Sequence, residues 1–68
     1  MNKATRQQSI LNLIYKEEIS SQEKLRKRLL ENGFSVTQAT LSRDLRELSV
    51  VKKSSEEGRY KYTLLDNW

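Results

Sequence analysis

The chain contains no cysteine, histidine or proline. Without cysteine it has no disulfide or thiolate–metal framework, and without histidine it lacks both a common zinc ligand and an imidazole base. It also has no glycine-rich phosphate loop, so we expect no enzyme activity and no cofactor site. Its apolar runs are too short to cross a membrane, and its first residues do not resemble a signal peptide. We therefore expect a cytoplasmic protein held together by hydrophobic packing, caps and turns.

Charge, by contrast, is plentiful and unevenly balanced. The 68 residues include 13 Lys and Arg against 9 Asp and Glu, which gives a net charge of +4. A positive surplus favours a polyanionic partner, although an ordinary solvated surface explains the same numbers equally well. The length allows a single domain over residues 1–68.

Apolar residues recur at helical spacing in two segments of the first half. The stripe within residues 3–15 consists of Ile10, Leu11, Leu13 and Ile14. A second helix is expected after a hydroxyl N-cap at Ser20 or Ser21, and Ser20 with Glu23 has the spacing of a capping box. Gly33 is expected to end this helix with a positive φ. The expected buried stripe of the second helix is Leu25, Leu29 and Leu30.

A third helix is predicted over residues 38–48, after a very short connector. Thr37 is the expected N-cap, and Val36 and Leu41 have the spacing of a hydrophobic staple. Leu41, Leu45 and Leu48 then recur at i, i+4 and i+7, which places them on one face.

After residue 48 the helical period gives way to a β-hairpin. Residues 50–52 are expected to form one strand, residues 54–58 a turn and residues 59–64 the second strand. The alternating pattern gives a core face of Tyr60, Tyr62 and Leu64 and an outer face of Arg59, Lys61 and Thr63. We favour a core role for the tyrosines over base stacking. Three helices, two of them joined tightly, followed by a hairpin predict an α+β winged helix-turn-helix fold.

The outer face of the third helix has side chains that suit base recognition. Opposite the leucines lie Ala39, Arg43 and Arg46, with Ser42 and Thr40 on the flanks and Gln38 in the first turn. Glutamine pairs with adenine, arginine pairs with guanine, and serine or threonine bonds to bases or phosphates. A solvated helix face, with Arg43–Glu47 or Asp44–Arg pairs, is the alternative.

Other polar and basic residues are predicted to contact the DNA backbone rather than bases. The predicted backbone contacts are Thr37, Arg46, Arg28, Arg59 and Lys61. Arg28 belongs to a basic run with Lys24, Arg26 and Lys27, of which one or two at most are expected to touch DNA. Lys3 and Arg6 are further candidates.

The stretch from Val36 to Leu48, VTQATLSRDLREL, closely resembles the recognition helix of the bacterial arginine repressor family. The resemblance continues through Val51-Lys52 and residues 58–62, and it reaches back to Ile19, Ser21-Gln22 and Leu25. It implies operator binding and regulation of arginine biosynthesis and catabolism genes. It also implies base contacts by Gln38, Ser42 and Arg43, with Thr40 as a further candidate. One departure is Lys24, where relatives often carry an acidic residue.

The same resemblance implies a second, C-terminal domain that residues 1–68 do not contain. In the family that domain binds L-arginine as co-repressor and assembles trimers into hexamers. We therefore expect the 68-residue chain to be monomeric. The alternative functions are a winged helix that binds protein and a nucleic-acid binder without sequence preference. The polar and basic face of the third helix favours DNA over a protein partner.

Overall fold

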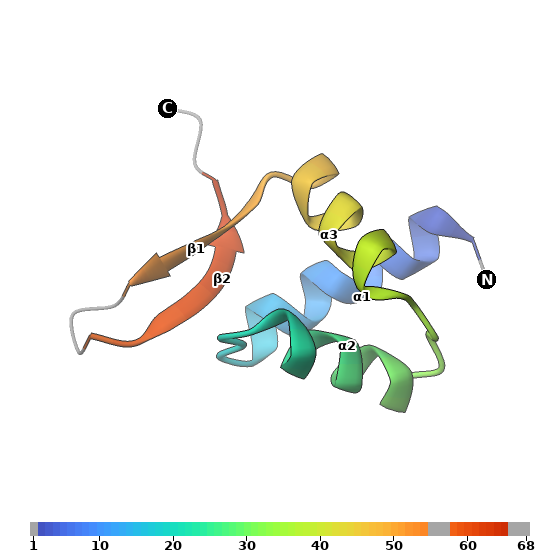
Figure 1. Cartoon of the computed structure of the whole chain (residues 1–68), viewed down its shortest axis with the longest axis horizontal. Helices are drawn as coiled ribbons and strands as arrows, with labels where there is room; N and C mark the ends of the chain where they lie inside the picture. The colour runs from blue at the N-terminus through green and yellow to red at the C-terminus, as the bar shows by residue number, and fades with distance from the viewer. Residues whose placement is uncertain (1, 55–57, 66–68) are drawn as a thin grey trace.

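The structure is a computed structural model that describes residues 2–54 and 58–65. Three helices, α1 (Lys3–Lys16), α2 (Gln22–Glu31) and α3 (Gln38–Glu47), precede the strands β1 (Val50–Ser54) and β2 (Tyr60–Leu64). The helices cluster together and the antiparallel hairpin projects from them (Figure 1). This order confirms the predicted α+β winged helix-turn-helix. None of the helices in the described ranges is long and apolar enough to cross a bilayer.

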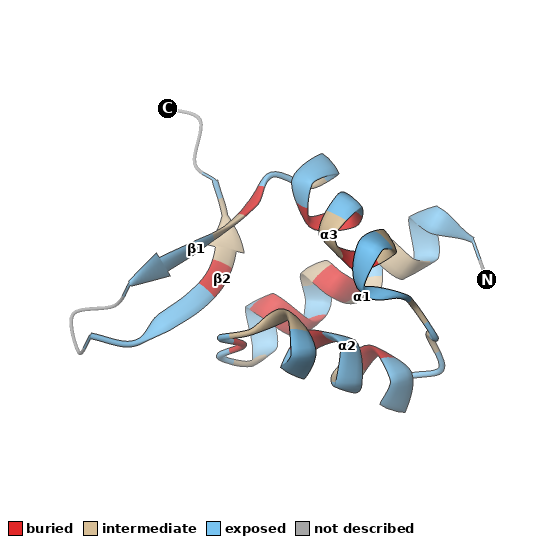
Figure 2. Cartoon of the chain, viewed as in Figure 1, coloured by how far each residue is buried: buried red, intermediate tan, exposed pale blue. Residues whose placement is uncertain are grey.

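One core joins all five elements. It is formed by the buried residues Ile10, Leu13, Ile14, Ile19, Leu25, Leu29, Leu41, Leu45, Val50 and Tyr62. The buried segments of the three helices face one another, whereas residues 52–54 and 60–61 of the hairpin are exposed (Figure 2). The prediction for Leu30 was wrong, because 61% of its surface is exposed. Leu30 follows Leu29 directly on α2 and is rotated by about 100° away from the core.

Helix α2 begins one residue later than a capping box at Ser20 would require. Ser21 is the N-cap, and its Oγ accepts a hydrogen bond of 3.1 Å from the backbone N–H of Lys24. Lys24 therefore stands where a capping box would place an acidic residue. The proposed Ser20–Glu23 box was wrong, and Ser21 makes Gln22 the first residue of the helix.

The turn between α2 and α3 is set by Gly33, whose φ of +89° confirms the predicted positive value. Asn32 is the C-cap, and Gly33 donates to the carbonyl of Leu30 at 3.0 Å. Phe34 donates to the carbonyl of Leu29 at 2.8 Å. These two bonds form a Schellman motif, which reverses the chain within a few residues. Helix α3 can therefore follow α2 closely.

The hairpin is attached to the helices at its base. The backbone N–H of Tyr62 donates to the carbonyl of Ile19 at 2.9 Å, and Leu65 donates to Ser49 at 2.8 Å. Strand β1 extends to Ser54, beyond the predicted residue 52, and β2 begins at Tyr60 rather than Arg59. Residues 55–57 of the predicted turn and residues 66–68 lie outside the described residues.

Only one of the two strand tyrosines closes the core. Tyr62 is buried, but Tyr60 is 57% exposed, so the predicted core role of Tyr60 was wrong. Tyr60 begins β2 at the end of the strand that lies away from the helices (Figure 1), so it has no core to pack against. There Lys52 covers both rings, with its Nζ 5.7 Å from the centre of Tyr60 and 5.9 Å from that of Tyr62.

Candidate nucleic-acid interface

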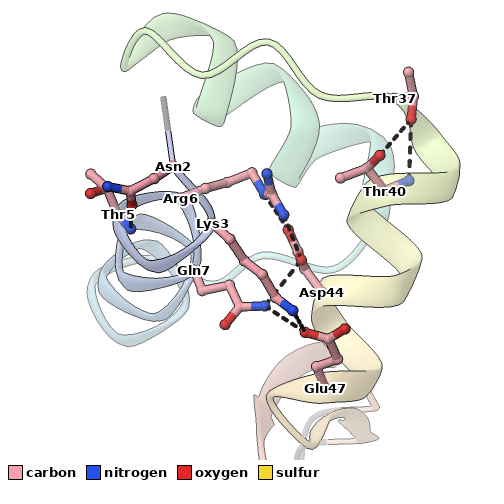
Figure 3. A network of polar contacts seen from close by, with 9 residues as sticks. All are labelled: Asn2, Lys3, Thr5, Arg6, Gln7, Thr37, Thr40, Asp44 and Glu47. Atoms are coloured by element: carbon pink, nitrogen blue, oxygen red, sulfur yellow. Dashed lines mark hydrogen bonds and ion pairs between the residues drawn. The ribbon is translucent and has the colours of Figure 1, made fainter.

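The N-terminus of α3 is capped as the sequence predicts. The Oγ1 of Thr37 accepts a hydrogen bond of 3.2 Å from the backbone N–H of Thr40 and lies 3.0 Å from the Thr40 hydroxyl. Figure 3 shows both threonines at the start of the helix. Capping by one side chain leaves the first two N–H groups of α3 directed outward. Together with the helix dipole, these groups favour an anion at this end of α3.

The exposed face of α3 is the face that the leucine spacing predicts. Gln38, Ala39, Arg43 and Arg46 are exposed, and Thr40 and Ser42 are half-buried on its flanks. Leu41 and Leu45 are buried on the opposite side, so the helical register is confirmed. The four predicted base-contacting residues Gln38, Thr40, Ser42 and Arg43 therefore belong to one helix face and its flanks.

Helix α1 contacts α3 through ion pairs and hydrogen bonds to the two acidic residues of α3, Asp44 and Glu47. Asp44 is only 1% exposed, and its carboxylate forms a two-pronged ion pair with Arg6, with Arg6 Nη2 at 2.9 Å from Oδ1. Gln7 donates to both Asp44 and Glu47, at 3.1 and 3.0 Å. Lys3 pairs with Glu47 at 2.7 Å. These side chains of α1 point toward α3 in Figure 3.

The network keeps both carboxylates of α3 ionised. Burial raises the pKa of Asp44, but hydrogen bonds from Arg6 and Gln7 and the charge of Arg6 outweigh it and lower the pKa below its usual range. Hydrogen bonds from Lys3 and Gln7 lower the pKa of Glu47. The hydrogen bond to Asp44 raises the pKa of Arg6.

This network argues against the alternative of a solvated helix face, in which the charged side chains of α3 pair with one another. Asp44 and Glu47 pair with α1, not with the arginines of their own helix. Within residues 2–54 and 58–65, neither Arg43 nor Arg46 forms an ion pair. The outer face of α3 therefore has two arginines whose charge no carboxylate of the described chain neutralises. Sequence reasoning missed the buried role of Asp44, since its partner is 38 residues away.

Gln22, which enters the sequence analysis only as part of the family resemblance, is a second residue whose contacts were not predicted. Its Oε1 accepts hydrogen bonds from Gln38 Nε2 at 2.6 Å and from Ser42 Oγ at 2.9 Å. These contacts link α2 to the exposed face of α3. The partners lie 16 and 20 residues away in sequence, so no local pattern reveals them.

Two cations of the basic run on α2, Arg28 and Lys24, make polar contacts within the domain. Arg28 pairs with Glu17, Nη2 to Oε2 at 2.6 Å, and also with Glu31. These contacts, first of all the hydrogen bonds that Arg28 donates to Glu17, raise the pKa of Arg28. Lys24 donates to the carbonyl of Glu18 at 3.2 Å. A phosphate contact by Arg28 stays a prediction, and it requires the phosphate to share or displace these carboxylates.

The hairpin presents a third positive surface. Lys61 is exposed and is the cross-strand partner of Lys53, which is also exposed. Directly opposed like charges destabilise a hairpin, and a bound anion relieves that repulsion. Arg59 is exposed just before β2, and its Nη1 lies 3.8 Å from Glu18 Oε2.

Comparison with known proteins agrees with this geometry. Residues 1–67 match the family model "Arginine repressor, DNA binding domain". The chain is 51% identical over 65 residues to an arginine repressor of Alkaliphilus oremlandii, covering 96% of the chain and 44% of that relative. It is 46% identical over 67 residues to an arginine repressor of Streptococcus pyogenes serotype M6, covering 98% and 46%. It therefore spans less than half the length of these relatives.

The family description states the class of function that the sequence favoured over catalysis, namely DNA binding. The match extends over both the helices and the hairpin, so it covers the fold as well as the α3 motif. The chain belongs to the arginine repressor DNA-binding domain family.

Proposed function

We propose that this domain binds operator DNA in the cytoplasm and represses genes of arginine metabolism, with α3 in the major groove. The observation that carries the proposal is the outer face of α3, where Arg43 and Arg46 lack carboxylate partners within the described ranges while α1 holds Asp44 and Glu47. Such a face combines positive charge with fixed orientation, as reading base edges requires.

The proposed contacts divide into two groups. The base-contacting group is Gln38, Thr40, Ser42 and Arg43, all on α3 or its flanks. The backbone-contacting group is Thr37, Arg46, Arg28, Arg59 and Lys61, spread over α3, α2 and the hairpin. Bases in one groove are reached from one helix, whereas phosphates on either side are reached from several elements.

A titration at fixed salt tests this function. We expect the 68-residue chain to bind an arginine-operator half-site more tightly than a scrambled duplex of the same length and composition. Because phosphate contacts dominate non-specific affinity, both duplexes must be compared over the same salt series. Equal affinities would support a binder without sequence preference. Binding to neither would support the protein-interaction alternative.

We further propose that residues 1–68 act as a monomer that does not respond to L-arginine. The family's effector and assembly functions are expected in a separate domain, and the chain spans only 44% of the Alkaliphilus relative. Sedimentation should give the mass of one chain, and calorimetry with L-arginine should give no saturable heat. A stable trimer or an arginine isotherm would contradict this expectation.

A further inference from the structure

We propose that Gln22 is a specificity-determining positioning residue, which orients Gln38 and Ser42 of α3 before DNA is bound. The inference rests on the proposed function, because it requires those two side chains to meet bases. It assigns a role to a residue of α2 that does not belong to the recognition helix itself.

The position of Gln22 follows from the cap of α2. Because Ser21 is the N-cap, Gln22 is the first residue of the helix, at the end of α2 where α3 crosses. Its single Oε1 accepts from Gln38 Nε2 at 2.6 Å and from Ser42 Oγ at 2.9 Å. One amide oxygen thus joins two side chains that lie one turn apart on α3.

For Gln38 this contact restricts an otherwise mobile side chain. A carboxamide nitrogen carries two hydrogens, and the bond to Gln22 uses one of them. The second hydrogen and Gln38 Oε1 remain, and they match the N7 acceptor and N6 donor of adenine. Without Gln22, an exposed glutamine must lose its rotamer freedom on binding, which weakens base recognition.

For Ser42 the contact determines which hydrogen-bonding role remains. A hydroxyl has one hydrogen, and here it is donated to Gln22. Ser42 can then act toward DNA only as an acceptor. In the major groove the donors are the amino groups of adenine and cytosine, whereas phosphates and guanine present acceptors. The structure thus assigns Ser42 to a base amino group.

The test compares Gln22→Met with wild type on an operator half-site and a scrambled duplex at one salt concentration. Methionine keeps the length and removes the acceptor. We expect the preference for operator to fall by about three- to tenfold, the effect of losing hydrogen bonds of ordinary strength. Affinity for the scrambled duplex and the melting temperature should stay close to wild type. Gln8→Met, on an exposed glutamine of α1, is the matched control and should change neither affinity.

The conservative variant Gln22→Glu retains acceptor oxygens and adds a negative charge. It should weaken both duplexes by a similar factor through repulsion of phosphates, while the operator preference is retained. In a Gln38→Ala/Ser42→Ala background, Gln22→Met should have no further effect on preference, because the residues through which it acts are gone.

Two results would overturn the assignment. If Gln22→Met weakens both duplexes equally, its amide contacts phosphate directly. If its effect persists in the double-alanine background, it does not act through Gln38 and Ser42. The single variants Gln38→Ala and Ser42→Ala show whether a negative result concerns only the role of Gln22 or the proposed base contacts as a whole. Should Gln38→Ala and Ser42→Ala both leave the preference intact, the base contacts themselves are wrong; should they lower it while Gln22→Met does not, only the role of Gln22 is wrong.

Discussion

Helix α3 and the β1–β2 hairpin carry much of the exposed positive charge, but the fold holds them in different ways. Helix α3 is fixed by buried leucines, by ion pairs to α1 and by hydrogen bonds to Gln22 of α2. The hairpin is fixed near its base, where Val50 and Tyr62 are buried, whereas residues 52–54 and 60–61 are exposed. Figure 2 shows this contrast along the two elements.

We propose that this difference corresponds to two kinds of recognition. Base edges present donors and acceptors at fixed positions, so the side chains that read them must be held with accuracy. Phosphates repeat along the backbone and attract any nearby cation, so a less restrained hairpin is sufficient. The following substitutions are ordered from the largest expected effect to the smallest, and each alters one side of this contrast.

Removing the leucine anchor of α3 should have the largest effect. Leu45 is 4% exposed, and Leu45→Ala should cost about 2–5 kcal/mol of unfolding free energy through lost transfer energy and a cavity. In a small domain with roughly 5 kcal/mol in total, this can unfold the chain. Chemical denaturation measures the change. Leu30→Ala is the control, and because Leu30 is 61% exposed it should change stability by less than about 0.5 kcal/mol. Similar effects of the two variants would contradict the assigned register.

Removing the charge of Asp44 should have the next largest effect. Asp44→Asn weakens the ion pair with Arg6 and should cost about 1.5–3 kcal/mol near pH 7. Because the folded pKa of Asp44 is lowered, its contribution is present above the unfolded pKa of about 3.9 and is lost as pH falls through the folded value. The stability difference between wild type and variant should therefore shrink below about pH 4.

Denaturation at several pH values checks this, with Glu23→Gln on the exposed side of α2 as control. A difference that stays constant from pH 7 to pH 3 would contradict a role for the ionised carboxylate.

The three helices and the N-cap of α3 were predictable because their causes are local. Thr37 and the leucine spacing lie within a few residues of the helix that they define, and both were confirmed. Gly33 likewise ends α2 for a local reason, because glycine readily adopts the positive φ that the turn requires. The family motif added the predicted base contacts of α3, which periodicity alone does not give and which stay a prediction.

The remaining features depend on partners far along the chain. Ile19 interrupts the helical pattern, but it is fully buried in the core, and its carbonyl accepts a hydrogen bond from the backbone N–H of Tyr62 in β2. Asp44 lies close to the leucine stripe on α3, but an aspartate is rarely buried without a charged partner. Its partner, Arg6, lies 38 residues away in the sequence. The contacts of Gln22 similarly require the packing of α2 on α3. These are tertiary contacts with no local sequence pattern.

Arg43→Ala should separate base reading from backbone holding on α3. Operator affinity should fall by about 1–3 kcal/mol, with relaxed preference at one base pair, while a random duplex loses less. The reason is that a bidentate contact to guanine is lost together with one charge. Titrations of both duplexes over a salt series measure this. Equal loss on both duplexes would make Arg43 a phosphate contact.

The smallest effect should come from the hairpin. There the same substitution should leave stability unchanged or raise it, but should lower the affinity for DNA. Lys61→Gln removes one of two opposed lysines, so relief of repulsion from Lys53 should leave the fold as stable or stabilise it by up to about 0.5 kcal/mol. The same change should weaken operator and random DNA alike, about three- to fivefold at physiological salt, and flatten the salt slope by about one unit. Lys16→Gln, at the end of α1, removes an equal charge and should change neither slope. If Lys61→Gln instead lowers the preference for operator over random DNA, the hairpin contributes to sequence recognition. The proposed contrast, in which α3 contacts bases and the hairpin contacts only phosphates, would then be wrong.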